Sequence, residues 1–432
     1  MKKRARLLPV SAVILLIALA LWGCGDMSML TVLKAKEVAA STVAQPTFSL
    51  AAGTYSSDQN VTITDSASGA TIYYTTDGSA PTASSLKYTT SITVAGPSTT
   101  ETIQAVATES GWNDSAVASA AYVISTPFAW TDETPSGAGH NLQWFSIASS
   151  SDGSHLAAVV TNGGGSIWTS ANYGVTWTAR AAAGARNWNS IASSSDGTHL
   201  AAVESNPTNN VWTSTDSGVT WTDQAAAGSH GWYSIASNSD GTHLAAVAYA
   251  GDIFTSANSG IAWTDQSAVG SKTWYSITSS SDGTRLAAAV QIGDIYTSTN
   301  YGATWADQTA SGPKNWFSIA TSSDGTHLAA VVNGGDIYTS SNYGATWTDQ
   351  TAAGSRTWWS IASSSDGSHL AAAVNGGDIY SSADSGLTWT DLTPNGSAAH
   401  NLGWNSVASS SDGTHLAAVA YNGDIWTYAQ VP

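Results

Sequence analysis

The side chains of this chain that could do chemistry recur at regular intervals. Histidines occupy one repeated position, and aspartates occupy a second. Zinc needs its ligands at about 2.0–2.1 Å, and calcium needs several oxygens in one place, so one ligand per repeat suits neither ion. We therefore predict no metal site and no cofactor, and assign both sets to turns. The histidines are His155, His199, His243, His327, His369 and His415, and the aspartates are Asp252, Asp294, Asp336, Asp378 and Asp424.

Carboxylates suited to glycan cleavage are scarce. A glycoside hydrolase needs two convergent carboxyl groups about 5–10 Å apart. Asp132, Glu133 and Asp391 are the candidates, because they lie in or at the start of the longest connections. The sequence favours a binding protein over an enzyme, and a glycoside hydrolase or lyase is the alternative.

These positions belong to one unit that occurs seven times. The copy at residues 315–356 holds four short runs rich in β-branched and aromatic residues, WFSIATS, HLAAVV, DIYTS and ATWTDQ, separated by Asp-Gly, Gly-Gly and Asn-Tyr-Gly. Such runs predict four antiparallel strands per unit. A period in the forties is typical of β-propellers and solenoids. The first tryptophan of the unit returns as Trp144, Trp188, Trp232, Trp274, Trp316, Trp358 and Trp404, at spacings of 44, 44, 42, 42, 42 and 46.

The repeat begins and ends out of phase. Residues 128–132 (FAWTD) form the fourth strand of a unit that lacks its first three, and residues 424–427 (DIWT) form a third strand without a fourth. If residues 128–134 complete the last unit, the ring closes and hides the sheet edges that an open solenoid exposes. We predict an all-β fold with a seven-bladed β-propeller over residues 126–432, closed by its N-terminal and C-terminal strands. An open solenoid is the alternative.

The third turn of the unit carries the pattern SxDxGxTW. Residues 214–221 (STDSGVTW) and 382–389 (SADSGLTW) match it fully, and asparagine replaces aspartate elsewhere. The pattern resembles the Asp-box (BNR) repeats of sialidase-type and photosystem-assembly-factor-type propellers. That resemblance implies a structural role in a hairpin for Asn172, Asp216, Asn258, Asn300, Asn342 and Asp384. It does not extend to sialidase activity, because the arginine cluster that would bind the substrate carboxylate is missing.

Two connections between units are longer than the others. The spacing between tryptophans across a connection is 11 in five cases, but 14 from Trp130 to Trp144 and 15 from Trp389 to Trp404. Both carry similar words, TPSGAGHNLQW and TPNGSAAHNLGW, and ring closure makes them neighbours. Because loops on rigid scaffolds often bind ligands, we predict a ligand site of His140, Asn141, Trp144, His400, Asn401 and Trp404. The alternatives are sequence drift in these loops, and packing between blades for the tryptophans.

The residue after each of these tryptophans varies, which suits a surface more than a fixed core. The set is Phe145, Asn189, Tyr233, Tyr275, Phe317, Trp359 and Asn405.

The N-terminus predicts export. MKKRAR precedes an uncharged apolar run at residues 7–22, and Leu21-Trp22-Gly23-Cys24 resembles a bacterial lipobox. The prediction is a signal peptide at residues 1–23 and a lipid-anchored tether at residues 24–45, with Cys24 acylated. An uncleaved anchor is the alternative. The protein is then a lipoprotein of the bacterial cell envelope.

Charge excludes nucleic acid as a partner. Residues 1–23 contain Lys2, Lys3, Arg4 and Arg6 and no acid, so 30 acidic and 9 basic residues remain, a net charge of about −21. Nucleic-acid binding needs clustered lysine and arginine.

Residues 46–125 predict a separate β-sandwich. The stretch GATIYYTTDGSAPT at residues 69–82 resembles the chitobiase C-terminal, immunoglobulin-like domain. The resemblance implies a spacer or accessory domain without catalysis. Together these features predict a monomeric, membrane-anchored recognition module for a glycan or an extracytoplasmic protein. An assembly factor or scaffold is a further alternative.

Overall fold

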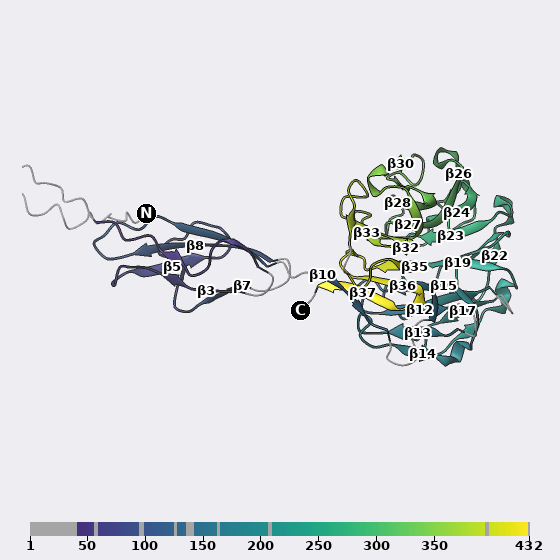
Figure 1. Cartoon of the computed structure of the whole chain (residues 1–432), viewed down its shortest axis with the longest axis horizontal. Coiled ribbons are helices and arrows are strands. Elements are labelled where there is room, and N and C mark those ends of the chain that lie inside the picture. The colour runs from purple at the N-terminus through teal and green to yellow at the C-terminus, as the bar shows by residue number, and fades with distance from the viewer. Residues whose placement is uncertain are drawn as a thin grey trace, which may run out of the picture. The chain divides into compact units, whose positions relative to one another are not determined.

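The computed structural model describes residues 41–55, 59–94, 99–124, 128–134, 142–161, 165–205, 210–393 and 397–430. The chain divides into two compact units, Met1–Ser125 and Thr126–Pro432 (Figure 1). The predicted signal peptide and Cys24 lie outside the described residues, as does the tether up to residue 40. Within the ranges given above, no helix is both long and apolar enough to cross a membrane.

The first unit is a small β-sandwich. A five-stranded sheet has the order β2-β9-β8-β5-β6, and the pairs β3-β7 and β1-β4 lie against it. Val61 and Ile92 from the smaller layer pack with Ile103 and Tyr122 from the larger one, so one core lies between the layers. The strands are β1 (Thr47–Phe48), β2 (Gly53–Tyr55), β3 (Gln59–Val61), β4 (Ile63–Thr64), β5 (Thr71–Thr75), β6 (Leu86–Lys87), β7 (Ile92–Val94), β8 (Thr99–Thr108) and β9 (Ala118–Ile124).

The second unit is a propeller whose described residues form seven four-stranded antiparallel blades. Blade 1 is β11 (Leu142–Ser149), β12 (Leu156–Val160), β13 (Ile167–Ser170) and β14 (Thr178–Arg180). Blade 2 is β15 (Trp188–Ser193), β16 (Leu200–Glu204), β17 (Val211–Ser214) and β18 (Thr222–Asp223). Blade 3 is β19 (Trp232–Ser237), β20 (Leu244–Ala248), β21 (Ile253–Ser256) and β22 (Thr264–Asp265). Blade 4 is β23 (Trp274–Ser279), β24 (Leu286–Gly293), β25 (Ile295–Ser298) and β26 (Ala306–Gln308).

The remaining blades follow the same plan. Blade 5 is β27 (Lys314–Thr321), β28 (Leu328–Gly335), β29 (Ile337–Ser340) and β30 (Thr348–Asp349). Blade 6 is β31 (Arg356–Ser363), β32 (Leu370–Gly377), β33 (Ile379–Ser382) and β34 (Thr390–Asp391). Blade 7 is β35 (Leu402–Ser409), β36 (Leu416–Gly423), β37 (Ile425–Gln430) and β10 (Phe128–Asp132). Five connections between blades hold short 3₁₀ helices: η2 (Ala181–Ala183), η3 (Ala225–Ala227), η4 (Ser267–Val269), η5 (Thr309–Ser311) and η6 (Thr351–Ala353).

Ring closure by the two chain ends is confirmed. Strand β10 pairs antiparallel with β37, with Trp130 opposite Tyr428. Trp130 also packs on Trp404, the first-strand tryptophan of blade 7, with ring centroids 5.9 Å apart. Trp221 and Trp188 make the same contact in blade 2, at 6.4 Å. The N-terminal strand therefore supplies the missing fourth strand, and an open solenoid is excluded.

A ring of backbone hydrogen bonds joins all seven blades. In each blade the residue before the Asp-Gly turn donates its N–H to the carbonyl of the same residue in the next blade, over 2.7–2.8 Å. The series returns to its start when Ser411 donates to Ser151. The members are Ser151, Ser195, Ser239, Ser281, Ser323, Ser365 and Ser411. This ring closes without a gap, so seven units fill the circle.

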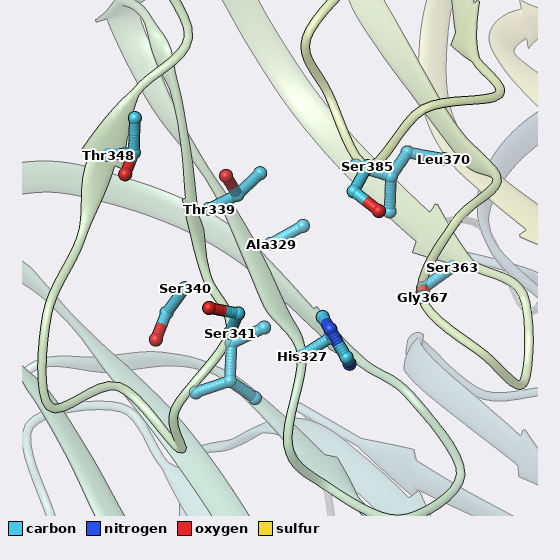
Figure 2. Close-up of a pocket in the computed structure, with 11 residues that line it drawn as sticks. His327, Ala329, Thr339, Ser340, Ser341, Thr348, Ser363, Gly367, Leu370 and Ser385 are labelled. Atoms are coloured by element: carbon cyan, nitrogen blue, oxygen red, sulfur yellow. The ribbon is translucent and has the colours of Figure 1, made fainter.

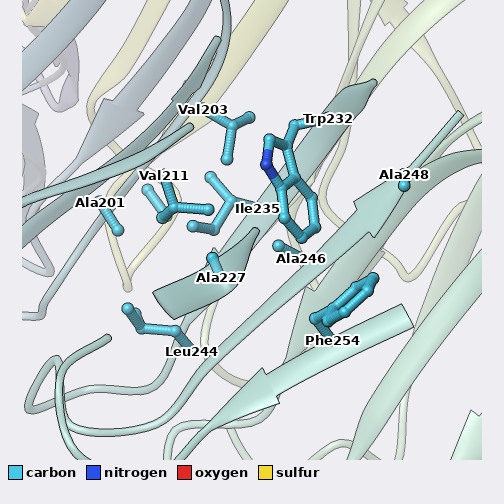
Figure 3. Close-up of a cluster of buried hydrophobic side chains, with 11 residues drawn as sticks. Ala201, Val203, Val211, Ala227, Trp232, Ile235, Leu244, Ala246, Ala248 and Phe254 are labelled. Carbon is cyan, nitrogen blue, oxygen red and sulfur yellow. The ribbon is translucent and has the colours of Figure 1, made fainter. Parts of the chain in front are cut away.

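The core lies between neighbouring blades. The second strand of each blade is buried on both faces; in β16 every residue is buried. Val203 and Val211 of blade 2 pack against Trp232 and Ile235 of blade 3 (Figure 3). Because small alanines alternate with these large side chains, the blades approach closely while their tryptophans fill the space between them.

Candidate functional site at the mouth of the propeller

The two ends of the propeller differ in what they present. The loop face carries the connections between strands two and three and those between blades. The turn face carries the turns between strands one and two, with the sequence Asp-Gly or similar, and the SxDxGxTW turns between strands three and four. Tyr249 N–H, on the loop face of blade 3, donates to the carbonyl of Gly231 over 2.7 Å. Tyr173 N–H, on the turn face of blade 1, donates to Ser154 over 2.9 Å. Meander topology therefore separates the two sets of connections.

The prediction that Trp144 and Trp404 contact a ligand is wrong. Both side chains are 0 % exposed, as are the five equivalent tryptophans. Trp144 packs with Ile147 and Trp168 inside one blade-to-blade core, and Trp404 packs in the next. A large indole buries more apolar surface in this position than any other side chain would, so the tryptophans stabilise the blade-to-blade cores and are not available to a ligand.

His400 and Asn401 shape the long loop that leads from β34 of blade 6 into β35 of blade 7, here called the blade 7 loop. His400 Nδ1 lies 2.7 Å from Asp378 Oδ1 and 3.0 Å from the carbonyl of Thr393. Asn401 donates its backbone N–H to the same Asp378 oxygen over 3.1 Å, and its amide Nδ2 lies 2.7 Å from His400 Nε2. Both ring nitrogens of His400 therefore have partners within the loop. This geometry fixes the loop and leaves the imidazole little capacity for a ligand.

His140 and Asn141, the other half of the predicted site, lie outside the described residues. The loop that contains them starts as the blade 7 loop does. Thr134 Oγ1 accepts the N–H of Ile425 over 2.9 Å, and Thr393 Oγ1 accepts the N–H of Ile379 over 3.0 Å. The two long loops thus share their first anchor.

A row of aromatic side chains borders the central channel at the loop face. We call Tyr233, Tyr275, Phe317 and Trp359 the aromatic arc. Their ring centroids are 4.2, 4.5 and 4.8 Å apart in sequence order, across four successive blades. Each follows the buried tryptophan of a first strand, at a bulge where the pairing with the second strand shifts by one residue. A bulge turns an extra side chain out of the sheet, here towards the axis.

The rest of the channel mouth is different. Asn189 donates its amide to the carbonyl of Trp232 over 2.9 Å, and Asn405 donates to that of Trp144 over 3.0 Å. Phe145 lies between these asparagines in the order of blades. Burial, followed by the neighbouring Tyr275, raises the pKa of Tyr233. The mouth therefore has partly exposed aromatic rings on one side and asparagine amides on the other.

Basic side chains border the same face in five consecutive blades, a lysine or an arginine in four of them and a histidine in blade 3. Each lies two residues before the buried tryptophan and packs on the aromatic ring that follows the first residue of the third strand. Arg186 lies 4.1 Å from the Trp212 ring centroid, and Lys314 lies 4.8 Å from that of Tyr338. The full set is Arg186, His230, Lys272, Lys314 and Arg356. Sequence reasoning missed this set, although its constant distance from the tryptophans could have revealed it.

The carboxylates weighed for catalysis take part in turns and in the packing between blades. Asp132 and Asp391 each accept the backbone N–H two residues on, at 3.0 and 2.9 Å, and so begin the two long loops. Burial raises the pKa of Glu133, with a smaller contribution from Asp132. A Cβ added to Gly174 of blade 1 would lie 3.7 Å from the Cβ of Glu133. Glu133 is thus at the seam between two blades.

The turn face is organised by side-chain hydrogen bonds. In the SxDxGxTW turn of blade 2, Asp216 accepts the hydroxyl of Ser214 at 2.8 Å and the backbone N–H of Thr220 at 2.8 Å. Asn342 accepts the equivalent donors in blade 5 through its amide oxygen, at 3.0 and 2.9 Å. Asparagine replaces aspartate here because both bonds need only one oxygen. The corresponding residues Asn172, Asn258, Asn300 and Asp384 accept the same two donors.

The recurring histidines and aspartates do not gather around a point. Across the described parts of the chain, no group of three or more His, Cys, Asp or Glu side chains could hold one metal ion.

The two units of the chain resemble different known proteins. Residues 50–119 match the chitobiase/β-hexosaminidase C-terminal domain. A 45-residue stretch is 56% identical to an endoglucanase of Clostridium saccharobutylicum, covering 10% of either chain. YCF48 from Cyanidioschyzon merolae matches 70% of this chain and 98% of its own, with a TM-score of 0.54 and 18% identity. YCF48 bound to D1 peptide matches 71% and 98%, with a TM-score of 0.55 and 17% identity.

The chain shares the propeller fold of YCF48. At this identity the likeness concerns the fold alone. The endoglucanase match spans about a tenth of that enzyme, so it carries no activity across.

Proposed function

We propose that this protein is an exported, membrane-anchored recognition module that binds a glycan or an extracytoplasmic protein at the mouth of its propeller. The aromatic arc is the observation that carries the proposal. Four adjacent, partly exposed rings at the channel mouth offer stacking surface beside the buried tryptophans, and Phe317 also packs against the core between blades 5 and 6. Rigid aromatic groups bind with little loss of side-chain entropy.

The comparisons support both ligand classes. A propeller of this fold has been solved with a peptide bound, which favours a protein segment. The chitobiase-type domain and the endoglucanase match favour a glycan. An assembly factor or scaffold is the second candidate, supported by the likeness to YCF48.

Other parts of the proposal come from the sequence. Acylation of Cys24 would hold the protein on the bacterial cell envelope, with residues 24–45 as a tether and the folded units acting as a monomer. The SxDxGxTW turns are assigned to the Asp-box class, with a structural role.

The test uses soluble residues 46–432 on a glycan array and in crosslinking to native envelope proteins, followed by Trp359→Ala and Tyr275→Ala. Each change should weaken capture about tenfold, equivalent to about 1.4 kcal/mol. Phe145→Ala, across the mouth, is the matched control and should change capture less than twofold. Equal capture by all three variants and the unaltered protein would refute a site at the arc.

A further inference from the structure

A second set of concave sites lies on the turn face, between neighbouring blades and away from the aromatic arc. Five grooves occur at equivalent positions in the described structure. Their free volumes are about 270 Å³ between blades 3 and 4, 80 Å³ between blades 5 and 6, and 10 Å³ at each of three other junctions, where there is room for about one water. Each takes its lining from the same repeat positions, so the propeller builds one kind of groove several times.

The groove between blades 5 and 6 shows the plan (Figure 2). His327 stands between a wall from blade 5, with Thr339 and Ser341, and a wall from blade 6, with Leu370 and Ser385. None of the side chains that line this groove or the one between blades 3 and 4 is an aspartate, glutamate, lysine or arginine. The surfaces are hydroxyls, leucine and alanine side chains and one imidazole, and the groove between blades 3 and 4 adds Gln266, Asn300 and Tyr301.

Hydrogen bonds fix the proton on that imidazole. Thr326 donates its single hydroxyl hydrogen to Asp324, 2.7 Å away. Thr326 Oγ1 can therefore only accept from His327 Nδ1, which lies 2.9 Å from it. The hydrogen must then be on Nδ1, which leaves the lone pair of a neutral ring on Nε2. The Ser322 hydroxyl, followed by the Thr326 backbone N–H, holds the pKa of Asp324 at about 2, so the carboxylate that starts this relay stays ionised near neutral pH.

The same relay recurs around the ring. His155, His199, His243, His369 and His415 each place Nδ1 at 2.9–3.0 Å from the hydroxyl of the preceding serine or threonine. At His243 the same Nδ1 also lies 3.4 Å from the amide Nδ2 of Asn238, which replaces the serine of the other blades. Four of the described grooves contain one of these relay histidines: His199, His243, His327 and His415. Within the described residues none of these four forms a hydrogen bond through Nε2. In the groove between blades 5 and 6 this acceptor lies beside the hydroxyls of Ser341, Thr348 and Ser385, while Thr339, Ser340 and Ser363 use theirs in hydrogen bonds within the protein.

We propose that the two roomier grooves, at His243 and His327, are subsites for neutral pyranose units, with the histidine Nε2 accepting a sugar hydroxyl. A pyranose ring offers hydroxyl donors at its edge and an apolar C–H face, matching the imidazole acceptor and the leucine and alanine floor. The lack of charged lining disfavours phosphates, sulfates and amines, which need compensation when they leave water. A single subsite of this size binds weakly, but two on one rigid ring give avidity for a repetitive polysaccharide.

Blade 4 supplies a natural contrast. Arg285 replaces the histidine there, stacks 3.9 Å from the Tyr343 ring centroid, and donates to the carbonyl of Asp324. That guanidinium occupies the groove and offers no acceptor. His243 faces Tyr301 of the next blade with ring centroids 4.8 Å apart, which is the same relation. His243→Arg should therefore fold with the blade 4 arrangement, and Arg285→His should open one more subsite.

The experiment uses the full chain in detergent, labelled with ¹⁵N-histidine, and titrated separately with cellotetraose and chitotetraose up to about 20 mM. Long-range ¹H–¹⁵N spectra report each imidazole tautomer and each occupied groove. We expect Nδ1-protonated signals for the relay histidines and sugar-induced Nε2 shifts for His243 and His327, with His230 and His400 of the loop face unchanged. His243→Arg should remove one shifting signal, and Arg285→His should add one.

The NMR titration and the capture assay distinguish this proposal from the proposed function. Trp359→Ala should leave the histidine shifts intact while it reduces capture at the loop face. If neither sugar shifts a relay histidine, or if both exchanges leave the number of shifting signals unchanged, the grooves are not pyranose subsites. Failure of the aromatic arc would appear only in the capture assay.

Discussion

Replacing Trp130 with alanine removes the side chain through which the N-terminal strand closes the ring. Trp130 packs on Trp404 at 5.9 Å and on Tyr428 at 5.2 Å between ring centroids. Truncating a buried tryptophan typically costs about 3–5 kcal/mol, and Trp130 is partly exposed, so we expect about 3 kcal/mol. For a propeller of roughly 300 residues, an unfolding entropy of about 2.1 cal/mol/K per residue converts this to about 5 °C in Tm.

Deleting residues 126–134 should lower Tm by about the same amount. The deletion also removes five residue pairs between β10 and β37. Each backbone hydrogen bond contributes about 1 kcal/mol net, while each residue released from the strand regains about 1–2 kcal/mol of conformational entropy. These two contributions roughly cancel, so the packing of Trp130 accounts for most of the loss.

Scanning calorimetry of the soluble chain measures both changes. Leu387→Ala is the control, because Leu387 is 66% exposed and its truncation should move Tm by less than about 1 °C. A Tm unchanged by either Trp130→Ala or the deletion would refute the closure mechanism. A deletion far more destabilising than the substitution would show that strand pairing contributes beyond its entropic cost.

Three further predictions concern the turns and the long loop. The pKa of Asp152 is held at about 2, first by the Ser150 hydroxyl and then by the Ser154 backbone N–H. The contribution of Asp152 to stability is therefore full above about pH 4 and is lost as the pH falls towards 2. Tm measured against pH should fall in that window, and a flat profile there would contradict the role of the turns. Ser382→Ala, which removes the hydroxyl that donates to Asp384 at 2.8 Å and accepts from Gly386 at 2.8 Å, should cost about 1–3 kcal/mol in urea unfolding, whereas Asn342→Asp should change stability by less than about 0.5 kcal/mol; equal effects would refute the single-oxygen explanation. His400→Ala should speed proteolysis within residues 393–401 severalfold with a Tm shift below about 2 °C, and an unchanged cleavage rate would argue against the imidazole as the anchor of that loop.

Much of the fold could be read from the sequence because the repeat is so regular. Short β-branched runs between glycine turns allow only strands, and the phase mismatch between residues 128–132 and 424–427 requires those ends to meet. The Asp-Gly turns were equally legible: Gly367 adopts a φ of +76°, where a side chain is strained, and a Cβ there would lie 2.6 Å from His327 Cβ.

The candidate site was less predictable. Tryptophans at the start of the first strands satisfy the pattern of either a display surface or a core, and only burial distinguishes the two. Trp144 and Trp404 proved to be core. The arc residues follow the core tryptophans by one position. A bulge that could not be predicted from the sequence turns their side chains towards the axis.

The sequence by itself determined the number of blades, the strand order, the closing strand and the turn chemistry, since these depend on local periodicity and on which strands lack partners. Tertiary structure decided which side chains meet. Tyr233, Tyr275, Phe317 and Trp359 are about 42 residues apart, yet they become one surface because the ring brings equivalent positions of successive blades together. Four of the relay histidines face grooves for the same reason, because each groove is lined by residues of two neighbouring blades.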